Sequence, residues 1–147
     1  MTENIRAKIL AEALREINRH GSNFHMDDLA RNLRISKRTL YENFSSKQEI
    51  IEQAIADFTD KIYAYHQRIV SDPAMTCEAK LIAYFDVPSD NWQVLSVRKT
   101  SDLLAKMPGT CERLQSRYKK DWLLLERLLD EAQETGEFKP FDKFLFL

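Results

Sequence analysis

The stretch "MDDLARNLRISKRTLYENF", Met26 to Phe44, contains two short amphipathic segments separated by a tight break. The first segment carries apolar residues at helical spacing, at Leu29, Ala30 and Leu33. In the second, Ser36 is of a residue type that caps helices, and Leu40 and Phe44 lie four residues apart on one helical edge. The stretch therefore predicts two short helices in succession.

The second of these helices gathers polar side chains away from its apolar edge. Arg38, Thr39, Glu42 and Asn43 point outward on a helical wheel, with Lys37 and Tyr41 at the borders. Bases neutralise phosphate charge, and hydroxyl groups donate to phosphate oxygens. The pattern is typical of a helix-turn-helix, whose last helix enters the DNA major groove. A charged surface helix in an all-helical bundle is the alternative that the pattern leaves open.

The flanking sequence predicts longer helices. Apolar residues recur from Ile5 to Ile17, before Gly21, and predict a first helix. Downstream, Ser46 and Glu49 have the spacing of a capping box, in which each side chain binds the backbone N–H of the other residue. The apolar pattern that follows predicts a helix of about 24 residues, or roughly 36 Å at 1.5 Å per residue.

The remainder also has helical periodicity. We predict helices over Met75–Phe85 and Asn91–Met107, and a long helix from Thr110 to Gly136. The last residues, "FDKFLFL", are unusually apolar. They are interpreted either as a contact for a partner or as a strand or coil packed on the chain's own core.

Composition restricts the class of protein. The 147 residues are 44% hydrophobic and 31% charged, with a net charge of −1, as expected for a globular protein without bulk affinity for polyanions. Bases nevertheless outnumber acids in residues 1–47, so one end is suited to meet DNA. No segment approaches the roughly 18 apolar residues of a membrane span. Cys77 and Cys111 are far apart and lack a metal-ligand spacing, which favours a cytoplasmic location.

The sequence displays no recognisable catalytic or metal-binding motif. His20, His25 and His66 are scattered, and neither a Gly-rich phosphate loop nor a G-x-S-x-G elbow is present. We therefore expect a protein that is not an enzyme and needs no cofactor or metal.

From Met26 to Ile51 the sequence resembles the DNA-binding signature of the TetR (tetracycline repressor) family of bacterial transcription regulators. The matching features are Leu29-Ala30, Ile35-Ser36-Lys37, Thr39-Leu40-Tyr41, Phe44, and Ser46-Lys47 opening a long helix. The resemblance implies an all-α fold: a three-helix DNA-binding head over residues 1–46, and an effector-binding and dimerisation region over residues 47–147. A linking helix over about residues 47–70 would join the two.

The resemblance also implies roles for individual residues. It places base or phosphate contacts on Ser36, Lys37 and Thr39, and phosphate contacts on Tyr41 and Lys47. Arg38 stands where the family often has Gly, which predicts an added base contact.

Two further positions depart from the family pattern. Arg34 replaces a turn Gly and must tolerate a strained or altered turn, for which a phosphate contact could compensate. His25 replaces the Thr or Ser that caps the second helix, and a charged imidazole there would still favour DNA.

The implied function is a homodimeric, sequence-specific regulator of double-stranded DNA, most simply a repressor that responds to a small-molecule effector. The candidate walls of an effector pocket are Tyr84, Phe85, Trp92, Met107, Tyr118 and Trp122. Ordinary core positions are the alternative for these residues. Family members generally carry two further helices after the region that matches "GEF", so we expect dimerisation through other surfaces or impaired pairing. Two alternatives stay open: a shortened regulator without effector response, and a helical ligand-binding or protein-binding module without DNA binding.

Overall fold

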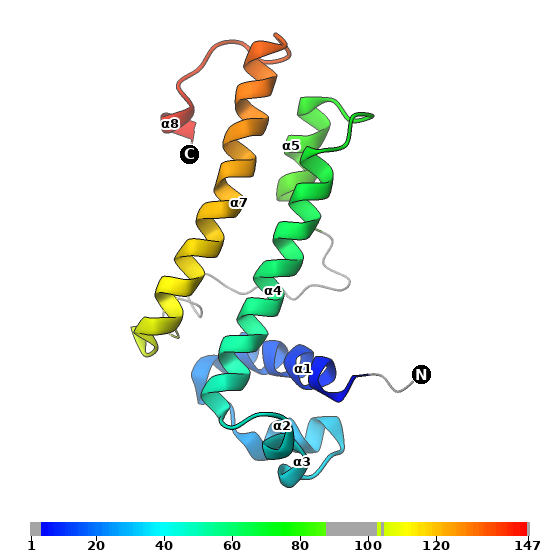
Figure 1. The fold of residues 1–147 in the computed structure, drawn as a ribbon, viewed down its shortest axis with the longest axis vertical. Helices are drawn as coiled ribbons and strands as arrows, with labels where there is room; N and C mark the ends of the chain where they lie inside the picture. The colour runs from blue at the N-terminus through cyan, green and yellow to red at the C-terminus, as the bar shows by residue number, and fades with distance from the viewer. Residues whose placement is uncertain (1–3, 88–102, 104, 147) are drawn as a thin grey trace. The chain divides into compact units, whose positions relative to one another are not determined.

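The computed structural model describes residues 4–87, 103 and 105–146. Its elements are α1 (Ile5–His20), a 3-10 turn (Gly21–Asn23), α2 (Met26–Leu33), α3 (Lys37–Asn43), α4 (Lys47–Val70), α5 (Cys77–Phe85), α7 (Pro108–Glu134) and α8 (Lys143–Phe146) (Figure 1). The predicted all-α fold is confirmed, since the described residues contain no strand. The helix predicted over Asn91–Met107 lies largely outside the described residues. None of the described helices is both long and apolar enough to cross a membrane.

The chain divides into two compact units. The first unit comprises Met1–Phe58 and Ser89–Leu114, and the second comprises Thr59–Pro88 and Gln115–Leu147. Helices α4 and α7 contribute residues to both units. The division differs from the predicted domain boundary after residue 46, because the amino-terminal half of α4 belongs to the first unit. Where the DNA-binding part ends functionally therefore stays a prediction.

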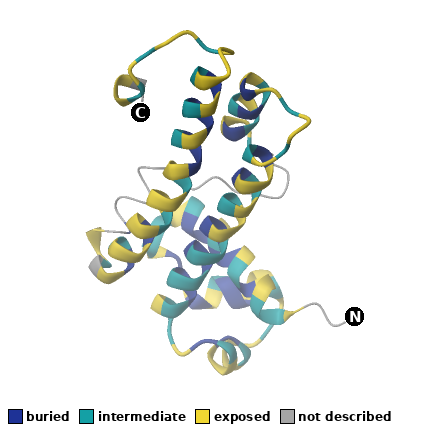
Figure 2. Ribbon diagram, turned by 45° about the horizontal axis from the view of Figure 1, so that its top comes forward, coloured by how far each residue is buried: buried dark blue, intermediate teal, exposed yellow. Residues whose placement is uncertain are grey.

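The first unit is built on the apolar faces that the sequence pattern indicated. Helices α1, α2, α3 and α4 each turn buried faces inward (Figure 2). Fully buried side chains on these faces include Ile9, Ile17, Leu29, Leu40, Ile50 and Ile55. Helix α2 contacts both α1 and α3. Helix α1 ends as predicted: Gly21 takes a positive φ of 62° and donates its N–H to the Ile17 carbonyl.

Two cations fix the ends of the short helices within the first unit. The Arg6 guanidinium lies 4.2 Å from the centre of the Phe44 ring and donates to the carbonyl of Asn43, the last residue of α3. The Lys47 ammonium donates to the carbonyls of Ser22 and Phe24, between α1 and α2. Since each cation joins distant parts of the chain, the pair restrains how α2 and α3 sit on α1 and α4.

The start of α4 corrects one prediction. The Ser46 hydroxyl accepts from the Glu49 N–H at 3.1 Å, as predicted for a capping box. The Glu49 carboxylate, however, accepts from the N–H and the hydroxyl of Ser45, both at 2.6 Å. The reciprocal half of the predicted box is therefore wrong, and the physical reason is that Ser45 offers this carboxylate two donors.

The second unit packs α5 against the carboxy-terminal halves of α4 and α7. Cys77 of α5 meets Leu128 and Ala132 of α7, with Val70 of α4 beside them. Buried residues of α5 and α7 lie on the sides where these helices meet (Figure 2).

The apolar residues near the carboxy terminus differ in their burial. Phe138 and Phe141 pack against the core of the second unit. Phe144 and Leu145 are 79% and 88% exposed. The predicted packing onto the chain's own core therefore holds for the first pair, and the segment carrying the second pair forms the short helix α8, not a strand.

Candidate nucleic-acid interface

The turn between α2 and α3 has a left-handed residue at its centre. Arg34 ends α2 with φ 55° and ψ 39°, and its N–H points to the carbonyls of Ala30 and Arg31. The Ile35 N–H reaches the Ala30 carbonyl at 3.0 Å. This is the bonding of a Schellman motif, whose left-handed position is usually Gly because a Cβ is strained there. The strained turn predicted at Arg34 is confirmed.

Two hydroxyl groups secure the start of α3. The Ser36 hydroxyl accepts from the Thr39 N–H at 3.0 Å, so the predicted cap is confirmed. It also shares a hydrogen bond of 2.9 Å with the Thr39 hydroxyl. Each hydroxyl has one donor and two acceptor positions, so capacity for a DNA contact remains on both side chains.

The two bases of α3 are held by acids. Lys37 pairs with Asp27 of α2 at 2.7 Å, and Arg38 pairs with Glu42 of α3 at 2.8 Å. The hydrogen bond between Lys37 and Asp27 raises the pKa of the lysine and lowers that of the aspartate. Exposed ion pairs of this kind contribute little to stability, because water and salt screen the two charges. A phosphate can therefore displace the acids at little cost.

Tyr41 and His25 are two further residues predicted to contact DNA. Tyr41 follows the buried Leu40 and is 48% exposed, which leaves its ring accessible from solvent. His25 precedes α2 at the cap position, but its side chain makes no capping hydrogen bond. The helix-capping contact made by Thr or Ser in the family pattern is therefore absent at His25.

Lys47 has a bracing role that the sequence analysis missed. Its ammonium is turned toward the carbonyls of Ser22 and Phe24 and lies 4.4 Å from the centre of the Phe24 ring. Burial, and secondarily the charge of Lys106, lower the pKa of Lys47. An ammonium has three donors, so one stays available beyond these two carbonyls. The predicted phosphate contact of Lys47 stays a prediction.

The predicted effector-pocket residues differ in burial and in the unit to which they belong. Tyr84 is buried in the second unit, whereas Phe85, Tyr118 and Trp122 are exposed there. Met107 belongs to the first unit, and Trp92 lies outside the described residues. The pocket stays a prediction, and none of the five described side chains lines the cleft of the second unit, whose walls are other residues.

Tyr84 belongs instead to a polar cluster in the second unit. Its hydroxyl donates to the Asp121 carboxylate at 3.0 Å, and its ring stacks on His66 with centroids 3.8 Å apart. The His66 ring nitrogens lie 2.7 Å from Asp121 Oδ1 and 3.0 Å from the Tyr84 carbonyl oxygen. The cluster ties α4, α5 and α7 together. The signal in the sequence was the position of His66 between Ile62 and Ile69 on the apolar stripe of α4.

The chain is similar to known transcriptional regulators along most of its length. A family model described as "Bacterial regulatory proteins, tetR family" matches residues 9–54, which run from α1 into α4. An uncharacterised HTH-type transcriptional regulator, YvaF of Bacillus subtilis, is 26% identical over 140 residues, which are 95% of this chain and 74% of that protein. The HTH-type transcriptional repressor KstR2 of Mycolicibacterium smegmatis is 24% identical over 77% of this chain and 57% of its own length.

Solved structures of TetR-family regulators are also similar to this chain. A TetR transcriptional regulator from Legionella pneumophila superposes with a TM-score of 0.71 at 26% identity, over 95% of this chain and 77% of that one. A putative TetR-family regulator from Vibrio parahaemolyticus has a TM-score of 0.64 at 20% identity, over 97% of this chain and 77% of that one, and supports the fold alone. The similarity thus extends well beyond the helix-turn-helix.

Proposed function

Because the chain belongs to the TetR family of bacterial regulatory proteins and is a DNA-binding transcriptional regulator, we propose that it represses transcription by binding an operator through α3. The observation that carries the proposal is the exposed start of α3, which presents hydroxyl and basic side chains immediately after the Arg34 turn. The similarity to the repressor KstR2 supports repression as the direction of control.

The proposed docking uses side chains of α3 and of the segments beside it in two ways. Ser36, Lys37 and Thr39 contact bases or phosphates near the start of the helix, and Arg38 adds a contact to a base edge. Tyr41, Lys47, Arg34 and His25 bind the phosphate backbone. Phosphates take the place of the acids that hold Lys37 and Arg38, which couples DNA binding to the loss of two weak ion pairs.

We further propose that the regulator acts as a homodimer in the bacterial cytoplasm, where operator DNA lies. Two heads would bind half-sites about 34–36 Å apart, which is one turn of DNA. A small-molecule effector in the second unit would change the spacing of the heads and release the operator. Helices α4 and α7 support this coupling because each has residues in both units.

The test is binding of the purified protein to DNA from upstream of its own gene, beside a scrambled duplex of equal length, over a range of salt concentrations. We expect preference for the native duplex, at least two chains per site, and an affinity that falls as salt rises. Equal and weak binding to both duplexes would contradict operator recognition. A single chain per site would contradict the dimer.

A charge variant makes this test more specific. Asp27→Asn removes the acid that holds Lys37, so we expect tighter binding to any duplex. Glu78→Gln, on an exposed residue of the second unit, changes the net charge equally and serves as the control. An equal gain in both variants would mean that bulk charge, and not the α2–α3 surface, meets the DNA.

A further inference from the structure

The second unit contains a cleft of about 330 Å³ that plays no part in the proposed DNA contacts. It is lined by Leu81 of α5, Leu129 of α7 and four residues that follow α7, namely Glu137, Phe138, Lys139 and Phe141. Four of these six side chains are apolar. The volume is at the lower end of the roughly 300–1,000 Å³ of small-molecule sites. At about 30 Å³ per water molecule, it holds about eleven groups of that size.

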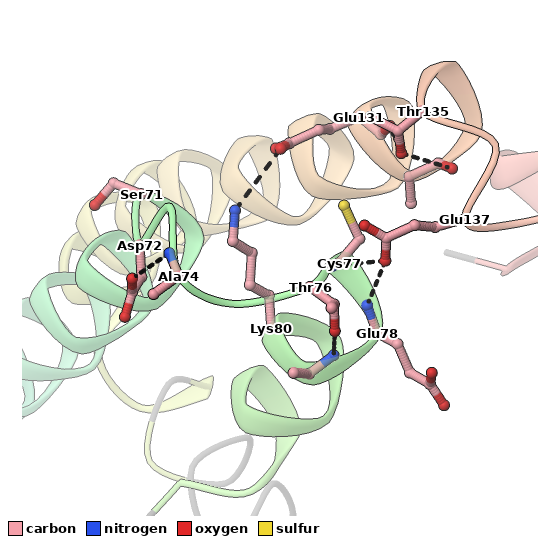
Figure 3. Close-up of polar contacts among 12 residues, drawn as sticks. Ser71, Asp72, Ala74, Thr76, Cys77, Glu78, Lys80, Glu131, Thr135 and Glu137 are labelled. Carbon is pink, nitrogen blue, oxygen red and sulfur yellow. Dashed lines mark hydrogen bonds and ion pairs between the residues drawn. The ribbon is translucent and has the colours of Figure 1, made fainter.

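The two charged residues of the cleft, Glu137 and Lys139, differ in whether a partner compensates their charge. One oxygen of the Glu137 carboxylate accepts from the N–H of Cys77 at 2.8 Å and from that of Glu78 at 3.4 Å, at the amino terminus of α5 (Figure 3). That helix end carries partial positive charge, so Glu137 is largely compensated. Lys139 forms no ion pair within the described part of the chain, and it is exposed.

We propose that this cleft binds a small amphipathic anion: an apolar chain or ring system of about ten heavy atoms that ends in a carboxylate. The apolar part would lie against Leu81, Leu129 and the two phenylalanines, and the carboxylate would meet Lys139 at the rim. Because the Lys139 ammonium beside this apolar cleft is uncompensated, it favours a ligand with a negatively charged end group over one whose end group is neutral or positively charged. The proposal rests on the proposed function in one respect, because it identifies the cleft as the effector site.

The contacts of Glu137 connect the cleft to the core of the second unit. The segment that lines the cleft also supplies the carboxylate that caps α5, and Phe138 of the same segment packs on Cys77 and Leu128. Lys80 of α5 forms an ion pair with Glu131 of α7 at 3.7 Å close by (Figure 3). A ligand that displaces this segment would therefore alter the packing of α5 on α7.

The direct test is calorimetric titration of the full chain with octanoate, octanol and octylamine, without DNA. We expect octanoate to bind at least about ten-fold more tightly than the other two. Lys139→Ala should remove this preference and leave octanol binding unchanged, whereas Lys139→Arg should retain it. Lys119→Ala, on an exposed residue of α7 outside the cleft lining, is the matched control and should behave as the parent. Leu81→Trp should block octanoate by filling the cleft.

Several outcomes would overturn the proposal. They are failure of all three probes to bind, equal affinity for octanoate and octanol, and equal effects of Lys139→Ala and Lys119→Ala. The proposed function fails separately, through the DNA titration without ligand. Octanoate binding that leaves operator affinity unchanged would support the site and refute its role as the effector site.

Discussion

Arg34 offers a substitution that separates folding from DNA binding. It is the one non-glycine residue with positive φ in the described part of the chain. A left-handed conformation costs an L-residue roughly 1–2 kcal/mol, and glycine forfeits about 0.4–1 kcal/mol through its freer unfolded state. Arg34→Gly should therefore raise the free energy of unfolding by about 1 kcal/mol.

The matched variant is Arg34→Ala, which removes the same guanidinium but keeps a Cβ in the strained position. Thermal denaturation should place Arg34→Gly about 2–4 °C above Arg34→Ala, the shift expected from 1 kcal/mol in a chain of this size. If Arg34 contacts phosphate, both variants should lose operator affinity equally, and the slope of log affinity against log salt should fall by about 0.9.

The two measurements test different parts of the reasoning. Equal melting temperatures for Arg34→Gly and Arg34→Ala would refute the argument from backbone strain. Unchanged DNA affinity in both would refute the phosphate contact and leave the strain argument intact.

Further outcomes are expected at Lys47, Tyr41, Arg38 and Tyr84. Lys47→Ala should destabilise the first unit by about 2 kcal/mol in chemical denaturation, through the loss of charged hydrogen bonds to two carbonyls, and it should also lower the salt slope if the third donor meets phosphate. Tyr41→Phe should weaken binding to every duplex in a fluorescence titration. Arg38→Ala should instead reduce the difference in affinity between the native and the scrambled duplex. Burial and the neighbouring Asp121 raise the pKa of Tyr84; the unfolded chain therefore ionises first, so the free energy of unfolding should fall above pH about 10. Tyr84→Phe should show a shallower fall.

The ion pairs that Lys37 and Arg38 form with acids change how the excess of bases in the amino-terminal third should be interpreted. Counting charges in the sequence treats each base as available to DNA. In the structure, both bases of α3 lie against acids, one on α2 and one on α3 itself. If α3 docks on DNA as proposed, these bases exchange their acidic partners for phosphates, and the salt dependence of binding should report that exchange as well as counterion release.

The sequence by itself determined the helices of the first unit, because their boundaries depend on neighbours in the chain. The cap at Ser36 and the left-handed end of α2 at Arg34 depend on hydrogen bonds between residues close together in the chain. The apolar spacing from Ile5 to Ile17 marks the buried face of α1. The family resemblance rested on the same local features and was confirmed by the comparisons.

Only the tertiary structure decided what distant residues do for one another. Lys47 braces carbonyls more than twenty residues upstream, and His66 meets an aspartate 55 residues downstream. The described cleft likewise joins side chains of α5 and α7 to the segment after α7, and not the aromatic residues that composition suggested. Periodicity specifies which face of a helix is buried, but the partner of each buried group depends on how the helices pack, and that information is not local in the chain.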